Sequence, residues 1–269
     1  MWNLTFISRD NFYKHVETTI MKYGEKIQPF DLERFNKIVI DPIKLVFDKI
    51  IYGYTWDQLI NIEIFRQRDS LDGNDNNDVG FFQRSIFNYI PHCRVSERGW
   101  DVVYENPSGV VMPDGSAVRT VYVEMKNKYN TMNSSSAART FIRMQDQLLS
   151  GDDCACFLVE AIAQTSQNIK WEIKFDQEKY GHKLIRRVSL DRFYALVTGQ
   201  EDAFYQVCAV LPSVVQEIMS TKRFFEKSAD TVFDELKSRS KKYDFGDEDM
   251  AFVMAIYMLG FGGYLGFPQ

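Results

Sequence analysis

Apolar residues in the first third of the chain recur every three or four positions, which is the spacing of an amphipathic helix. This pattern predicts helices over residues 10–23, 32–49, 56–68 and 81–90. The second of these is interrupted or restarted near Asp41-Pro42, and Thr55 is a suitable N-cap for the third. We therefore expect the first third to be mainly helical.

Further along, the sequence changes to short runs of β-branched and aromatic residues, which are typical of strands. Strands are expected over residues 101–104, 109–112, 118–126, 154–163, 170–175 and 185–188. Turn-forming residues cluster at 106–109 and 113–116, between the first three strands. Helices are expected over 137–149, 191–197 and most of 201–259. The predicted fold class is α/β, with a mixed β-sheet of four to six strands flanked by helices.

No internal repeat, low-complexity tract or long linker divides the 269 residues. A chain of this length buries roughly three quarters of its unfolded surface when it folds. We therefore expect a single domain over residues 1–269. Within it we expect a mainly helical part at 1–98, an α/β core at 99–200 and a helical part at 201–269.

The composition is that of an ordinary globular protein, with 45% apolar and 26% charged residues. The 32 basic and 37 acidic residues give a formal net charge of -5, which excludes a protein that is basic throughout. This charge does not exclude binding of nucleic acid through a local basic face. The four cysteines form no CxxC pair and have no zinc-like spacing, so we expect free thiols in a reducing compartment.

Neither end of the chain has the pattern of an export signal or a membrane span. Residues 1–5 lack the basic start and apolar core of a signal peptide. The uncharged stretch 250–269 is interrupted by glycines, and its helical part is too short to cross about 30 Å of hydrocarbon. We expect no membrane contact and a cytoplasmic location. The apolar helix at 251–259 would pack in the core or form a dimer interface.

The strand expected at 118–126 carries the most informative side chains. Because side chains alternate along a strand, Glu124 and Lys126 face one side while Val123 and Met125 face the other. Burying Lys126 is costly unless an anion such as Glu124 compensates for its charge. The alternative interpretation is an incidental ion pair on an exposed hairpin.

Asp101, on the neighbouring strand, completes a constellation that is typical of metal-dependent nucleases. The carboxylates of Asp101 and Glu124 suit Mg²⁺, which prefers oxygen ligands and keeps several waters, and the backbone carbonyl of Met125 offers a further ligand. The metal would supply an activated water as the nucleophile, and Lys126 would orient this water or stabilise charge on the attacked phosphate. Glu63 is a further candidate metal ligand, or else a surface residue paired with a neighbour on its own helix.

Longer stretches of the sequence carry a family resemblance. The most distinctive is Val123-Glu-Met-Lys-Asn-Lys128 followed by Tyr129-Asn-Thr-Met-Asn-Ser-Ser-Ser136. Similar segments are Asp41-Pro-Ile-Lys-Leu45, Gly99-Trp-Asp101, Ser166-Gln-Asn-Ile-Lys-Trp171, Ile185-Arg-Arg-Val-Ser189 and Leu196-Val-Thr-Gly199. On these segments the chain resembles the type II restriction endonucleases that cleave GGNCC-type sites. It departs from the family at the residue before the metal-binding Asp, where the usual Pro is Trp100.

The resemblance implies a restriction-endonuclease-like nuclease core, dependence on Mg²⁺, and double-strand cleavage that leaves 5′-phosphates. By position, Asp101, Glu124 and Lys126 take the catalytic roles. The implied partners are double-stranded DNA and a methyltransferase that acts on the same site. A homodimer is expected because a palindromic site mirrors two-fold protein symmetry. Two alternatives stay open: a structure-specific repair or RNA-processing nuclease of this fold, and a non-catalytic DNA-binding protein on it.

Two parts of the chain supply candidates for DNA contact. The run 127–136 is rich in hydroxyl and amide groups and leads into a helix, whose N-terminus suits phosphates. Two arginines lie four residues apart on that helix, and a second basic patch precedes the helix at 191–197. The alternatives are a solvated loop, local ion pairs and strand-edge charges. The candidates are Asn127, Lys128, Asn130, Asn133, Ser134, Ser135, Arg139, Arg143, His182, Arg186 and Arg187.

Overall fold

The computed structural model describes residues 2–26, 29–70, 78–96, 99–151, 153–175, 178–221, 229–264 and 267. The chain forms two compact units. Unit 1 contains Met1–Met21 and Asn77–Lys222, and unit 2 contains Lys22–Asn76 and Arg223–Gln269. Each unit has a hydrophobic core of its own, and the expected single domain over 1–269 stays a prediction.

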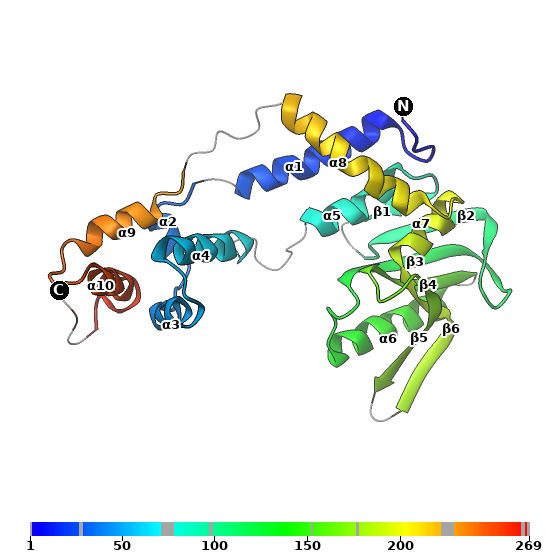
Figure 1. Ribbon diagram of the computed structural model, residues 1–269. Coiled ribbons are helices and arrows are strands. Elements are labelled where there is room, and N and C mark those ends of the chain that lie inside the picture. The colour runs from blue at the N-terminus through cyan, green and yellow to red at the C-terminus, as the bar shows by residue number, and fades with distance from the viewer. Residues whose placement is uncertain are drawn as a thin grey trace. The chain divides into compact units, whose positions relative to one another are not determined.

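Unit 1 is built on a mixed sheet, which has six strands within the described residues (Figure 1). The strands lie in the order β1-β2-β3-β4-β6-β5. The neighbours β3, β4 and β6 run parallel, and the other neighbours pair antiparallel. The α/β class and the predicted range of strand number are confirmed. The strands are β1 (Cys93–Val95), β2 (Val102–Val111), β3 (Ala117–Lys128), β4 (Cys154–Ile162), β5 (Asn168–Phe175) and β6 (Glu178–Ser189).

Helices cover both faces of this sheet, as predicted (Figure 1). On one face, α6 (Ser134–Ser150) buries Phe141 and Met144 against Cys156 and Leu158 of β4. On the other face, α7 (Leu190–Thr198) contacts β4 and β6, and α8 (Ala203–Thr221) packs on α7. The central strand β4 is buried along nearly its whole length, which explains its continuous apolar sequence.

The β2–β3 hairpin departs from the sequence prediction at one place. The first two predicted strands are a single strand, β2, so the predicted turn at 106–109 is wrong. The register with β3 shifts there, which marks a β-bulge. Asn106 accepts a hydrogen bond from the Ser108 N–H at 3.0 Å and Gly109 adopts a φ of 85°, so these turn-forming residues build the bulge. The turn predicted at 113–116 is confirmed.

Capping residues explain where several helices begin. The carboxylate of Asp41 accepts from the Lys44 N–H at 3.1 Å and caps α3. Thr55 and Gln58 form a capping box at the start of α4, each side chain accepting from the other's N–H. The helix predicted at 81–90 is a short α-helix continued by a 3₁₀ turn. These elements are α1 (Arg9–Lys26), α2 (Leu32–Asn36), α3 (Pro42–Tyr52), α4 (Trp56–Ser70), α5 (Asp78–Ser85) and η1 (Ile86–Tyr89).

Unit 2 gathers α2, α3 and α4 with α9 (Val232–Ser240) and α10 (Glu248–Phe261) around one core. Phe35, Ile60, Leu236 and Ile256 are completely buried in it. The apolar helix expected at 251–259 therefore packs in the core of its unit. In the part of the chain that the structure describes, no helix is long and apolar enough to cross a membrane.

Candidate active site

The open end of the β2–β3 hairpin positions Asp101. Val102 of β2 pairs with Val123 of β3, and the Asp101 N–H donates to the Val123 carbonyl at 2.9 Å. The Oδ2 atom of Asp101 accepts from the N–H of Met125 at 2.7 Å. Asp101 is therefore held across the hairpin from Glu124, one position beyond the last paired residues.

Glu124 lies between two cations. Its Oε1 atom is 2.8 Å from Nζ of Lys126, and its Oε2 atom is 3.0 Å from Nη1 of Arg143 on α6. The side chain of Glu124 is 15% exposed, and these two partners offset the cost of removing its charge from water. The alternation predicted for β3 places Tyr122, Glu124 and Lys126 on the face that α6 covers.

A third cation contacts Asp101 from α5. The Nη1 atom of Arg84 lies 2.9 Å from Oδ1 of Asp101. The sequence interpretation missed Arg84, because the contact depends on how α5 docks against the hairpin. No motif around Arg84 carries that information.

Trp100 connects Asp101 to α6. Its indole ring lies under the guanidinium of Arg143, whose carbon is 3.9 Å from the ring centroid, and its Nε1 donates to Oε1 of Gln147 at 2.9 Å. The ring also packs against Tyr122. Trp100, which stands where the resemblance led us to expect Pro, thus holds the guanidinium of Arg143 beside Glu124.

The donor atoms at this end of the hairpin are oxygens. In the described parts of the chain, no group of three or more His, Cys, Asp and Glu side chains is placed to hold a metal. Because the N–H and carbonyl of a strand residue point the same way, the Met125 carbonyl faces the same side as its bond to Asp101. Two carboxylates and one carbonyl, completed by water, are a donor set that suits Mg²⁺.

Comparison with known proteins identifies the family. The Eco47II restriction endonuclease family matches residues 4–220 of the chain. The chain belongs to this family. It is 27% identical to the type II restriction enzyme Sau96I of Staphylococcus aureus over 246 residues, covering 88% of this chain and 89% of the relative. It is 25% identical to the type II restriction enzyme Eco47II of Escherichia coli over 232 residues, covering 81% and 89%.

The protein is therefore a type II restriction endonuclease, a site-specific deoxyribonuclease. Restriction endonucleases act on DNA and generally use a divalent metal ion. The matched segment includes Asp101, Glu124 and Lys126. The assignment favours the restriction enzyme over the repair nuclease, the RNA-processing nuclease and the non-catalytic DNA-binding protein.

Around the start of α6 the endonuclease presents the polar residues that the sequence singled out. Asn133 is the N-cap, and its Oδ1 accepts from the Ser136 N–H at 2.9 Å. Asn127 is half-buried. Five further candidates are exposed: Lys128, Asn130, Ser134, Ser135 and Arg139.

The second basic patch is largely occupied by internal contacts. Arg186 is 6% exposed and donates to both the side chain and the carbonyl of Asn168, and burial lowers the pKa of its guanidinium. His182 is exposed, and its Nδ1 accepts from the Leu184 N–H. Of the three candidates His182, Arg186 and Arg187, only His182 is exposed.

Arg187 belongs to a buried ion pair that the sequence interpretation missed. Glu160 of β4 pairs in register with Lys126 and is 1% exposed. Arg187 donates from Nε to its Oε1 at 2.7 Å, and from Nη2 to the Tyr129 carbonyl at 2.9 Å. The sequence offered one signal for this ion pair, namely a glutamate inside the apolar run 154–163. A buried carboxylate requires a partner inside the protein.

Glu63 belongs to α4 of unit 2, whereas the hairpin belongs to unit 1. Its carboxylate accepts from Nη1 of Arg66 at 3.4 Å. This is the surface pairing that the sequence left open as the alternative. Its role as an extra metal ligand stays a prediction.

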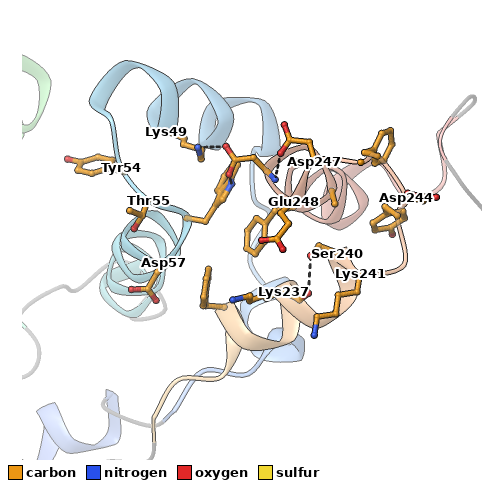
Figure 2. Close-up of a pocket in the computed structure, with 18 residues that line it drawn as sticks. Lys49, Tyr54, Thr55, Asp57, Lys237, Ser240, Lys241, Asp244, Asp247 and Glu248 are labelled. Atoms are coloured by element: carbon orange, nitrogen blue, oxygen red, sulfur yellow. Dashed lines mark hydrogen bonds and ion pairs between the residues drawn. The ribbon is translucent and has the colours of Figure 1, made fainter.

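Unit 2 also contains a cavity of about 610 Å³ between the ends of α3, α4, α9 and α10 (Figure 2). Trp56 and Phe252 stack in its wall, and Lys237, Lys241 and Glu248 line it. Several of its polar groups are already paired, since Asp249 accepts from both Lys49 and the Trp56 indole. The cavity combines aromatic rings with charges of both signs and has no feature that selects one ligand.

Proposed function

We propose that this endonuclease hydrolyses phosphodiester bonds of double-stranded DNA at a short palindromic GGNCC-like site, with Mg²⁺ as its cofactor, and leaves 5′-phosphates. The observation that carries the catalytic part is the position of Asp101, Glu124 and Lys126 at one end of the hairpin. The site preference rests on the sequence resemblance.

The acidic side chains would bind the metal, and the basic side chain would act on the water or the phosphate. Asp101, Glu124 and the carbonyl of Met125 would hold the metal, and Glu63 is an additional candidate ligand. When bound, Mg²⁺ supplies a water of lowered pKa and offsets the negative charge of the phosphate. Lys126, held 2.8 Å from Glu124, would donate to the attacking water or to a phosphate oxygen as charge builds there.

DNA contact is proposed first for the exposed groups around the start of α6. Lys128 and Arg139 are exposed cations, and Asn130, Ser134 and Ser135 add neutral donors. Asn127, Asn133, Arg143 and His182 are the next candidates. Arg186 and Arg187 would contact DNA only if they left the partners that now hold them.

A homodimer is the proposed working form. A palindromic site has two-fold symmetry, and a homodimer with the same symmetry would present one active site to each strand. A methyltransferase that modifies the same site is the proposed functional partner, because unmodified sites in the host genome would otherwise be cut.

Digestion of a plasmid of known sequence tests the proposal. With Mg²⁺, the wild-type enzyme should give discrete bands whose ends map to GGNCC-like sites and carry 5′-phosphates, and a metal chelator should stop the cleavage. Glu124→Ala serves as the inactive control. A smear, or cutting that follows DNA structure rather than sequence, would contradict the proposed specificity, and absence of cutting with Mg²⁺ would contradict the proposed chemistry.

A further inference from the structure

The charges around the two catalytic carboxylates do not balance. Asp101 and Glu124 together carry two negative charges. Three cations contact them: Arg84 at 2.9 Å, Lys126 at 2.8 Å and Arg143 at 3.0 Å. The adjacent Glu160–Arg187 pair is neutral by itself. The cluster therefore carries a formal net charge of +1.

The side chain of Arg84 pairs with Asp101. Among the described residues Asp101 is the only side chain that it pairs with, and its Nε is buried without a hydrogen-bond partner. The second oxygen of Asp101 is already occupied by the Met125 N–H. Arg84 thus compensates for the charge of Asp101 and fixes the rotation of its carboxylate.

Arg143 has the equivalent position on the other carboxylate. It reaches Oε2 of Glu124 from α6 while Lys126 takes Oε1, and the ring of Trp100 supports its guanidinium. The side chain is 41% exposed, so it contacts the carboxylate and solvent at once. Each arginine forms an ion pair with a proposed metal ligand, and each belongs to a helix outside the hairpin.

We propose that Arg84 and Arg143 are positioning residues that set the order of binding, and this rests on the proposed metal-dependent nuclease function. They hold Asp101 and Glu124 in place when no metal is bound. Their positive charge makes the metal-free site attract an anion such as a DNA phosphate. A divalent cation approaching a cluster of charge +1 is repelled. A DNA phosphate is attracted and brings the cluster to about zero, after which the metal binds more favourably. The enzyme therefore takes up DNA before the metal.

Titration of the DNA-free enzyme with Mg²⁺ in a calorimeter tests this order. Removing one positive charge should tighten Mg²⁺ binding about five-fold or more, because contact between unit charges has that effect even in water. We expect this gain for Arg84→Gln and for Arg143→Gln. Arg84→Lys, which keeps the charge, should stay close to wild type. Arg119→Gln is the matched control, since Arg119 lies on the same strand β3 and, within the described residues, its side chain pairs with the exposed Asp153 and not with the cluster.

A second measurement follows DNA binding without metal. With chelator present, Arg84→Gln and Arg143→Gln should bind a fluorescent duplex containing the site more weakly than Arg119→Gln does. Unchanged or weaker Mg²⁺ binding in both glutamine variants, with folding verified by thermal unfolding, would overturn the inference. If wild type cuts plasmid but the variants match it in Mg²⁺ affinity, only the inference fails. If wild type does not cut with Mg²⁺, the proposed function fails.

Discussion

The two members of the Glu124–Lys126 pair should differ when each is replaced by alanine. Both substitutions should abolish cleavage, but only Glu124→Ala should clearly destabilise unit 1. Without Lys126, the carboxylate keeps its contact with Arg143 at 3.0 Å. Without Glu124, Lys126 and Arg143 lose the partner that they share and are left as neighbouring like charges.

The structure indicates the size of the loss in cleavage rate and of the loss in stability. Removing one group that stabilises the developing charge costs about 10²–10³-fold in rate. Exposed ion pairs contribute about 0.2–1 kcal/mol, and breaking a fully buried pair costs about 3–5 kcal/mol. The side chain of Glu124 is 15% exposed and that of Lys126 is 30% exposed. We therefore expect Glu124→Ala to lower the free energy of unfolding by about 1–2 kcal/mol, and Lys126→Ala by less than about 1 kcal/mol.

Three assays separate chemistry from stability: plasmid cleavage with Mg²⁺, DNA binding in chelator, and thermal unfolding. Glu172→Ala is the matched control, because Glu172 forms the same two-residue pair with Lys170 on β5, where both side chains are nearly half exposed. It should leave cleavage and stability unchanged. The reasoning is refuted if Lys126→Ala cuts at a rate near wild type, or if Glu124→Ala is no less stable than Glu172→Ala. For Glu124→Ala, which removes no positive charge, loss of DNA binding in parallel with cleavage would indicate a structural role.

Three further predictions concern residues around the site. Arg187→Ala should lower the free energy of unfolding by about 3 kcal/mol in chemical denaturation, because the buried carboxylate of Glu160 loses its counter-charge; lower DNA affinity at unchanged stability would favour a DNA contact instead. Asn133→Ala should cost about 1 kcal/mol by removing the N-cap of α6, and Asn133→Asp should restore the melting temperature. Burial lowers the pKa of His15, so the unfolded chain takes up a proton first as the pH falls. The free energy of unfolding should therefore decrease below about pH 6.5, and His15→Gln should flatten that decrease.

The part of the candidate active site that lies on one hairpin was predictable from the sequence. The turn residues at 113–116 and the alternation along β3 fix which side chains share a face, and this alone places Glu124 beside Lys126. Asp101 follows from the same pairing, because it comes directly before the strand that pairs with β3. Local rules of this kind depend on neighbours along the chain and on strand parity, both of which are visible in the sequence.

The contacts between separate elements were not predictable in the same way. Arg84 reaches Asp101 only because α5 docks at the end of the hairpin, and Arg187 reaches Glu160 only because β6 lies parallel to β4. Helical spacing correctly groups Arg139 with Arg143 on α6, yet among the described residues only Arg143 contacts a carboxylate. The bulge in β2 was missed because the residues at 106–109 have the same composition as a turn between strands.

One physical requirement sorts the basic residues that the sequence proposed for DNA. A cation that is removed from water needs a partner inside the protein, and a cation that has such a partner is poorly available to a phosphate. Arg186 and Arg187 are held in this way by Asn168 and Glu160, while Lys128 and Arg139 keep their charge in solvent. The net charge of -5 is therefore compatible with DNA binding, because attraction depends on exposed cations near the site and not on the total. Arg143 is intermediate, since it is paired with Glu124 and still 41% exposed.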